Sequence, residues 1–126
     1  MVSKLRLQRI NERIHHELSE LMIQAVNDPR LARVSITGVK VDRELAFGDV
    51  YISAPDGSQR SREILDALNH ARGFLRNELA NRVDLRIFPR LRFHWDPTPE
   101  RADHIEHLLE QIRQEGQAKE TSSTDG

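Results

Sequence analysis

The spacing of apolar residues changes several times along this chain, and the order of those changes is the feature that most restricts its fold. Helical spacing of three or four residues holds over residues 4–26, 61–79 and 98–116. Strand-like patterns hold over residues 34–41, 49–54 and 85–95. The sequence therefore predicts an α+β domain in which helices cover one face of a three-stranded sheet.

Two glycines interrupt these patterns. The inward-facing residues of the first predicted strand change phase at Gly38, which predicts a β-bulge there. Gly73 interrupts the apolar stripe of residues 61–79, and a glycine permits a sharp kink in a helix. We therefore expect two helices that meet near Gly73. A crossover through both helices is long enough to make the second and third strands parallel, whereas the short link after residue 41 makes the first two strands a hairpin.

Length and composition restrict the class of protein. A chain of 126 residues with 37% apolar residues can bury one core, so we expect a single domain. The absence of cysteine excludes disulfides, thiolate metal sites and cysteine nucleophiles, and it favours a reducing, cytoplasmic setting. No apolar run exceeds three residues, which is far short of the roughly 20 needed to cross a bilayer. The charged N-terminus also lacks the apolar stretch of a secretory signal.

The net charge of −1 conceals an uneven distribution. Residues 1–100 contain 16 basic and 14 acidic side chains, whereas residues 101–126 contain 3 and 6. The last ten residues contain a single apolar side chain, Ala118, and cannot bury enough surface to repay ordering. We therefore expect a domain over residues 1–116, with its last helix ending near Gly116, and a disordered acidic tail over residues 117–126.

Arginine is the main cation of this chain, which has only three lysines. The planar guanidinium suits phosphate recognition, and phosphate contacts position a protein on RNA without reading its sequence. One group of arginines lies on the predicted first helix opposite its apolar stripe, a second lies beside Gly73, and a third alternates outward on the last strand. These arginines are Arg6, Arg9, Arg13, Arg72, Arg76, Arg90 and Arg92. Arginine also serves surface ion pairs, and a solvated face explains most such groups, so they become candidates for RNA contact only together with a resemblance to a known family.

Catalytic and cofactor motifs are missing. The six glycines form neither a dinucleotide-binding fingerprint nor a phosphate loop, and no serine lies in a nucleophile elbow. His104 and His107 are three residues apart and could in principle hold a metal, but no third ligand is indicated, so a solvated helix flank is the favoured interpretation. Phe93 and Trp95 share a strand face with Leu91, which favours core packing over base stacking. We expect no enzyme activity, cofactor, metal or small-molecule substrate.

Residues 69–76 carry a resemblance to a known family. A type II KH domain has the predicted order of elements, and its nucleic-acid loop has a glycine at both ends. Here only the second glycine is present, because His70 stands in the first position. The resulting Ala71-Arg72-Gly73 resembles the Ala-x-Gly kink of the ribosome-binding factor A family, a KH-like family of bacterial assembly factors. The resemblance extends over roughly residues 4–113 and includes residues 28–31, 37–45, 50–53 and 85–93.

The resemblance implies a function that the residue patterns do not show. It implies a non-enzymatic, cytoplasmic factor that binds the immature small (30S) ribosomal subunit and its 16S rRNA. It also implies a role in late maturation, including processing of the 5′ end of the rRNA, and a structural kink formed by Ala71 and Gly73. We expect the protein to be a monomer in isolation.

Two other classes of function stay open at this stage. A generic KH-type module would bind short single-stranded RNA, although the missing first glycine disfavours it. A protein-interaction domain would use the acidic C-terminal helix and would bind its partner irrespective of RNA.

Overall fold

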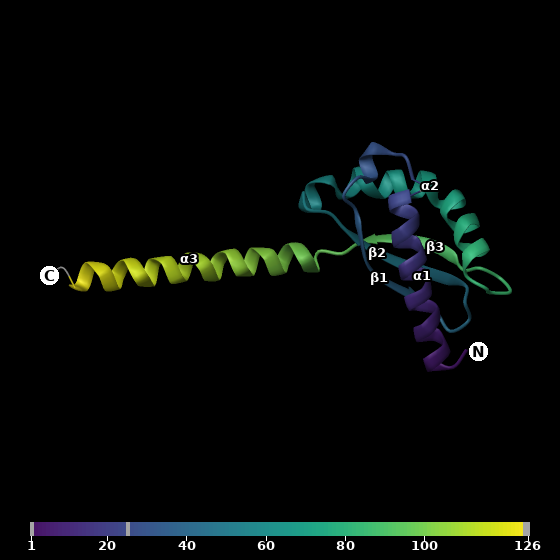
Figure 1. The fold of residues 1–126 in the computed structure, drawn as a ribbon, viewed down its shortest axis with the longest axis horizontal. Helices are drawn as coiled ribbons and strands as arrows, with labels where there is room; N and C mark the ends of the chain where they lie inside the picture. The colour runs from purple at the N-terminus through teal and green to yellow at the C-terminus, as the bar shows by residue number, and fades with distance from the viewer. Residues whose placement is uncertain (1, 25, 125–126) are drawn as a thin grey trace. The chain divides into compact units, whose positions relative to one another are not determined.

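The described part of the chain contains three α-helices, a three-stranded sheet and two short 3-10 turns (Figure 1). The computed structural model describes residues 2–24 and 26–124, and the side chains of residues 2–24 and 26–117. The chain forms two compact units, Met1–Asp96 and Pro97–Gly126. The first unit contains α1 (Lys4–Gln24), η1 (Pro29–Leu31), β1 (Ser35–Val41), β2 (Phe47–Ser53), η2 (Gly57–Arg60), α2 (Ser61–Arg82) and β3 (Arg90–Trp95).

The sheet has the predicted topology. Its strand order is β1-β2-β3, with β1 antiparallel to β2 and β2 parallel to β3. The register of the β1–β2 pair shifts between Ile36 and Gly38, which confirms the predicted bulge. In the hairpin loop, Oδ1 of Asp42 accepts hydrogen bonds from the backbone N–H groups of Ala46 and Phe47 at 2.7 and 2.9 Å.

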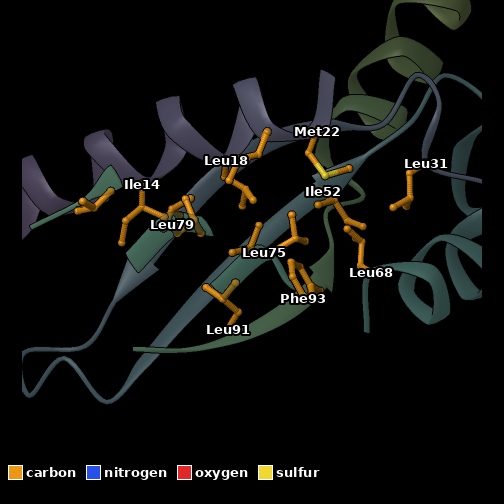
Figure 2. Packing of buried hydrophobic residues seen from close by; sticks show 14 of the residues in the cluster. Ile14, Leu18, Met22, Leu31, Ile52, Leu68, Leu75, Leu79, Leu91 and Phe93 are labelled. Atoms are coloured by element: carbon orange, nitrogen blue, oxygen red, sulfur yellow. The ribbon is translucent and has the colours of Figure 1, made fainter. Parts of the chain in front are cut away.

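Both α1 and α2 pack on one face of the sheet and form a two-layer core with it. Figure 2 shows Ile14 and Leu18 of α1 directed toward side chains of the strands, with Leu75 of α2 among them. All three are completely buried. Complete burial of each such side chain stabilises the fold by about 1.5–3 kcal/mol. The buried apolar side chains of the strands come from alternating positions: Val39, Val41, Val50, Ile52, Leu91 and Phe93.

The alternating pattern of residues 85–95 predicts a strand that is broken or begins at Pro89, and in the structure β3 begins directly after that proline, at Arg90. Pro89 lacks an N–H group and cannot donate to the sheet, whereas the N–H of Arg90 donates to the carbonyl oxygen of Ala46 at 2.9 Å. Ile87, which the alternation predicted to face inward, is 72% exposed in the preceding loop. Phe93 is buried and Trp95 is partly buried against the core, as predicted.

The two helices predicted around Gly73 are a single helix, α2, which is unbroken across Ala71 and Gly73. A glycine costs about 1 kcal/mol relative to alanine inside a helix, yet it keeps the N–H group that the helix needs. The burial of Leu68, Leu75 and their neighbours outweighs that cost. The ribbon of α2 changes direction about midway along its length without a break (Figure 1). A Cβ atom at Gly73 would meet nothing within 4 Å, so no close backbone approach requires this glycine.

The second unit is built on α3 (Thr98–Thr124), which begins at Thr98 and Pro99 as predicted. It continues past Gly116, where the sequence predicted its end, because the residues that follow include the good helix formers glutamine, alanine, lysine and glutamate. The predicted boundary at residue 116 therefore lies inside α3, and residues 125–126 lie outside the described part. No side chain over residues 98–117 is buried. None of the described helices combines the length and apolar character that crossing a membrane requires.

Candidate nucleic-acid interface

The outward side of α1 carries three of the predicted arginines. Because Ile10, Ile14 and Leu18 face the core, the polar residues between them face away from it. Arg6 and Arg9 are exposed, and in the described part of the chain neither guanidinium has a hydrogen-bond or ion-pair partner. These two side chains are open to an incoming anion.

Arg13 lies on the same side of α1 but contributes to the packing of two helices. Its Nη2 atom lies 3.2 Å from Oε1 of Glu17 and 3.4 Å from the carbonyl oxygen of Arg82 on α2. Glu17 is buried, and Nη1 of Arg82 lies 3.5 Å from its other carboxylate oxygen. A buried carboxylate requires such cations. We name Arg6, Arg9 and Arg13 together the α1 arginine face.

Sequence reasoning missed Arg82, whose guanidinium meets this face although it ends a different helix. Only the packing of α1 against α2 brings Arg82 to Glu17, and no local pattern could indicate that contact. The side chain of Arg82 is 30% exposed.

The two arginines predicted on α2 differ in their surroundings. Arg72 is exposed, and it has no side-chain partner within the described ranges. Arg76 is half-buried and donates hydrogen bonds to the carbonyl oxygens of Phe88 and Pro89 at 2.8 and 3.3 Å. Its guanidinium thus ties α2 to the loop before β3, whereas that of Arg72 is available to a ligand.

Arg90 and Arg92 lie on the face of the sheet that neither α1 nor α2 covers. Arg92 forms two hydrogen bonds with Asp49 on β2, of 2.8 and 3.0 Å, and its guanidinium lies 4.2 Å from the ring centroid of Phe47. His94 contacts Oδ1 of Asp49 through Nε2 at 2.7 Å. Arg90 is exposed, and its side chain has no partner among the residues described. The uncovered residues, which we name the open sheet face, are Lys40, Phe47, Asp49, Tyr51, Arg90, Arg92 and His94.

Arg92 and His94 stabilise the ionised form of the Asp49 carboxyl. The hydrogen bonds from Arg92 lower the pKa of the Asp49 carboxyl, and His94 lowers it further, against the opposing effect of partial burial. The same hydrogen bonds raise the pKa of Arg92. Asp49 is therefore an anion at neutral pH, and any phosphate that approaches Arg92 must compete with it.

The predicted arginines do not form one continuous surface. The helices α1 and α2 cover one face of the sheet (Figure 1). The α1 arginine face is on the side of α1 opposite its buried residues, whereas Arg90 and Arg92 belong to the uncovered face of the sheet. Side chains alternate between the two faces of a strand, and the core occupies one of them. A single ligand at the α1 arginine face therefore does not reach the open sheet face unless it extends around the domain.

One group of potential metal ligands was not predicted. His16, Glu17 and Glu20 place ligand atoms within 4.8 Å of one another on α1. Glu17 is already paired with Arg13 and Arg82, and Nε2 of His16 lies 3.2 Å from Oε1 of Glu20. A cation there would have to displace two arginines, so this group carries no functional assignment. His104 and His107 are exposed on α3.

Comparison with known proteins decides the family. The family model for ribosome-binding factor A matches residues 6–109. The chain belongs to the ribosome-binding factor A family. It is 42% identical over 123 residues to ribosome-binding factor A of Acinetobacter baumannii, covering 91% of this chain and 92% of the relative. It is 39% identical over 108 residues to that of Chromohalobacter salexigens, covering 84% and 82%.

Solved structures of the ribosome-binding factor A family agree with this fold. The crystal structure of the Thermus thermophilus protein matches with a TM-score of 0.63 at 29% identity, covering 71% of this chain and 93% of that one. A homology model of the Thermus thermophilus factor, fitted into a cryo-EM map of a 30S complex, matches with a TM-score of 0.55 at 31% identity. It covers 66% of this chain and 87% of that model. The predicted KH-like type II architecture is consistent with both.

Proposed function

We propose that this protein binds the immature small ribosomal subunit, contacts its 16S rRNA and acts in its assembly. The observation that carries the proposal is the match to ribosome-binding factor A over residues 6–109, together with a structural relative placed in a 30S complex. The finer part of the proposal is a role in late maturation, including processing of the 5′ end of the rRNA. That part is supported by the family resemblance of the sequence alone.

The α1 arginine face supplies the main contact with rRNA phosphates in this proposal. Arg6 and Arg9 lie one helical turn apart and are unpaired within the described residues, so an approaching phosphate displaces no internal partner. Arg13 joins them with part of its hydrogen-bonding capacity already used by Glu17. Arg72 is a further open cation on α2. Binding of this kind requires no reaction centre and no cofactor. We further propose that the protein is cytoplasmic, where its ribosomal partner is assembled, and that it is a monomer in isolation.

The test is co-sedimentation of the full chain with purified small subunits at several salt concentrations. We expect binding that weakens as salt rises, because each neutralised phosphate releases counterions. The double variant Arg6→Glu with Arg9→Glu should bind at least about tenfold more weakly. It should also show a salt slope that is smaller by about one to two. Arg13 is left unchanged, because its loss would also remove one of the two cations paired with the buried Glu17.

The matched control is Arg101→Glu with Arg113→Glu, which makes the same change in net charge on α3. We expect the control to bind nearly as the parent does. Equal weakening of both variants would show that overall charge, and not the α1 arginine face, determines binding. No binding of the parent chain to small subunits at low salt would contradict the proposed function itself.

The structure argues against a generic KH-type RNA module and favours a protein contact through α3 as the second candidate function. A generic KH-type module clamps nucleic acid with a loop between two helices, but α2 passes unbroken through His70 and Gly73. A protein contact through α3 is favoured by its exposed apolar residues, which include Ile105 and Ile112 at 56% and 62% exposure. Nuclease treatment separates the two kinds of partner, since binding that survives digestion of the RNA depends on protein.

A further inference from the structure

The open sheet face combines planar side chains and cations in an arrangement that the core does not explain. Phe47, Asp49 and Tyr51 of β2 lie in direct register with Arg90, Arg92 and His94 of β3. Their neighbours Val50, Leu91 and Phe93 fill the core on the other face. Within the described part of the first unit, no helix covers these side chains.

Two stacked pairs lie side by side on this face. The rings of Tyr51 and His94 have centroids 5.3 Å apart and planes inclined by 30°. The guanidinium of Arg92 lies over the ring of Phe47 at 4.2 Å. Asp49 lies between the pairs and accepts hydrogen bonds from both Arg92 and His94, so it holds both planes in place. The side chains of Arg92 and His94 are nonetheless 49% and 42% exposed.

The charges of the face suit a polyanion, and the contacts of Arg92 determine which part of it would be recognised. Lys40 and Arg92 lie in register with Asp49, and Arg90 lies in register with Phe47. The open sheet face thus carries three cations, Lys40, Arg90 and Arg92, and one carboxylate, that of Asp49. Asp49 already engages Nε and Nη2 of Arg92, and the ring of Phe47 lies against one side of the guanidinium. Arg92 therefore presents the other side of its plane, together with Nη1, to a ligand. Aromatic and guanidinium planes are the surfaces on which unpaired RNA bases stack. Arg90, which has no internal partner among the described residues, can contact the adjoining phosphate.

We propose that the open sheet face is a stacking site for an unpaired RNA base, formed by Tyr51, His94 and the Asp49-held plane of Arg92, with Arg90 at the phosphate. This inference rests on the proposed function for its RNA partner, but it concerns a surface on the opposite side of the domain from the α1 arginine face. It assigns Asp49 as a positioning residue. It also assigns Arg92 a role that depends on the planarity of its guanidinium more than on its positive charge.

Three substitutions in the full chain test the stacking role. Tyr51→Leu removes a ring but keeps apolar bulk, and Arg92→Lys keeps the charge but removes the plane. Each should weaken binding of a single-stranded oligoadenylate of about six nucleotides by about 5- to 150-fold, the range measured for loss of one stacked base. Arg62→Lys is the matched control, because it makes the same change at an exposed arginine of α2 that belongs to neither proposed site, and it should bind nearly as the parent does. Urea unfolding checks that each variant is folded. Tyr51→Phe keeps the aromatic ring, so it should keep the affinity for the oligonucleotide.

The measurement combines NMR titration with that oligonucleotide and co-sedimentation with small subunits. We expect ring-current shifts at Tyr51 and His94, and weaker subunit binding by Tyr51→Leu and Arg92→Lys. Absence of ring shifts, or parent-like affinity of folded Tyr51→Leu, overturns the stacking site. Weaker subunit binding by Tyr51→Leu without any ring shift from the oligonucleotide also overturns it, because the face then meets protein. If the parent chain fails to bind subunits, the proposed function falls, and the oligonucleotide titration still decides the stacking site.

Discussion

The guanidinium of Arg76 on α2 donates a hydrogen bond to the carbonyl oxygen of Phe88 at 2.8 Å, across the loop that leads into β3. A second hydrogen bond, to the carbonyl oxygen of Pro89, is 3.3 Å long. Both acceptors belong to buried residues that have no strand partner before β3 begins. An arginine predicted as an RNA contact is therefore also a structural tie between helix and sheet.

Replacing Arg76 should destabilise the domain. Arg76→Met keeps the unbranched stem but leaves two carbonyl groups without their donor, and hydrogen bonds from charged groups contribute about 1.5–3 kcal/mol. We expect the free energy of unfolding, measured in urea, to fall by about that amount. Arg72→Met, one turn earlier and exposed, should change it by no more than about 0.5 kcal/mol. Equal unfolding midpoints for the two variants would show that the tie contributes nothing.

Gly73→Ala should stabilise the protein. The residue lies inside α2, it is exposed, and an added Cβ atom meets nothing within 4 Å. Alanine is favoured over glycine in a helix interior by about 0.5–1 kcal/mol. We expect a higher melting temperature by calorimetry. Gly57→Ala is the control of opposite sign, because Gly57 has a φ of 71° that a side chain disfavours. A lower melting temperature for Gly73→Ala would mean that this glycine has a backbone role that the helix does not reveal.

The Asp49 carboxyl should titrate below its ordinary range. Arg92, and then His94, lower its pKa in the folded state, so the resulting stabilisation is present above the unfolded value of about 3.9. It is lost as pH falls through the folded value. Carbon NMR of the Asp49 side chain should give a midpoint below 3.9 in the parent and a higher one in Arg92→Gln. The stability difference between the parent and Asp49→Asn should likewise shrink with acidification below about pH 4. A midpoint at or above the ordinary value would contradict the contacts of Asp49.

The sequence predicts much of the fold because the core imposes periodicity on it. The phase change at Gly38 located the bulge, and the long crossover predicted the parallel pairing of β2 with β3. The end of α3 and the continuity of α2 were not predicted. In both places the sequence signal was one glycine, whose cost of about 1 kcal/mol is smaller than the stabilisation of the helix around it.

The candidate site was less predictable than the fold, because its contacts join residues far apart in sequence. Periodicity placed Arg6 and Arg9 on an outward face, and the structure leaves them there. It could not show that Arg76 bonds to Phe88, nor that Arg92 bonds to Asp49 across 43 positions of sequence. Asp49 was assigned only as a strand residue. Asp49 contacts Arg92 and His94 because β2 and β3 pair in a particular register, and no local sequence pattern sets that register.

The core of the first unit should dominate stability, and two isoleucines on α1 test this with the same substitution. Ile14 of α1 is completely buried in the core (Figure 2). Ile23, near the end of the same helix, is 84% exposed. Ile14→Ala removes buried carbon and leaves a cavity, so the free energy of unfolding should fall by about 2–5 kcal/mol. Ile23→Ala should change it by no more than about 0.5 kcal/mol, because the helix propensity of alanine offsets the little contact that is lost. The measurement is urea unfolding of both variants at equal concentration. Equal losses at the two positions would be incompatible with α1 packing through its Ile14 side.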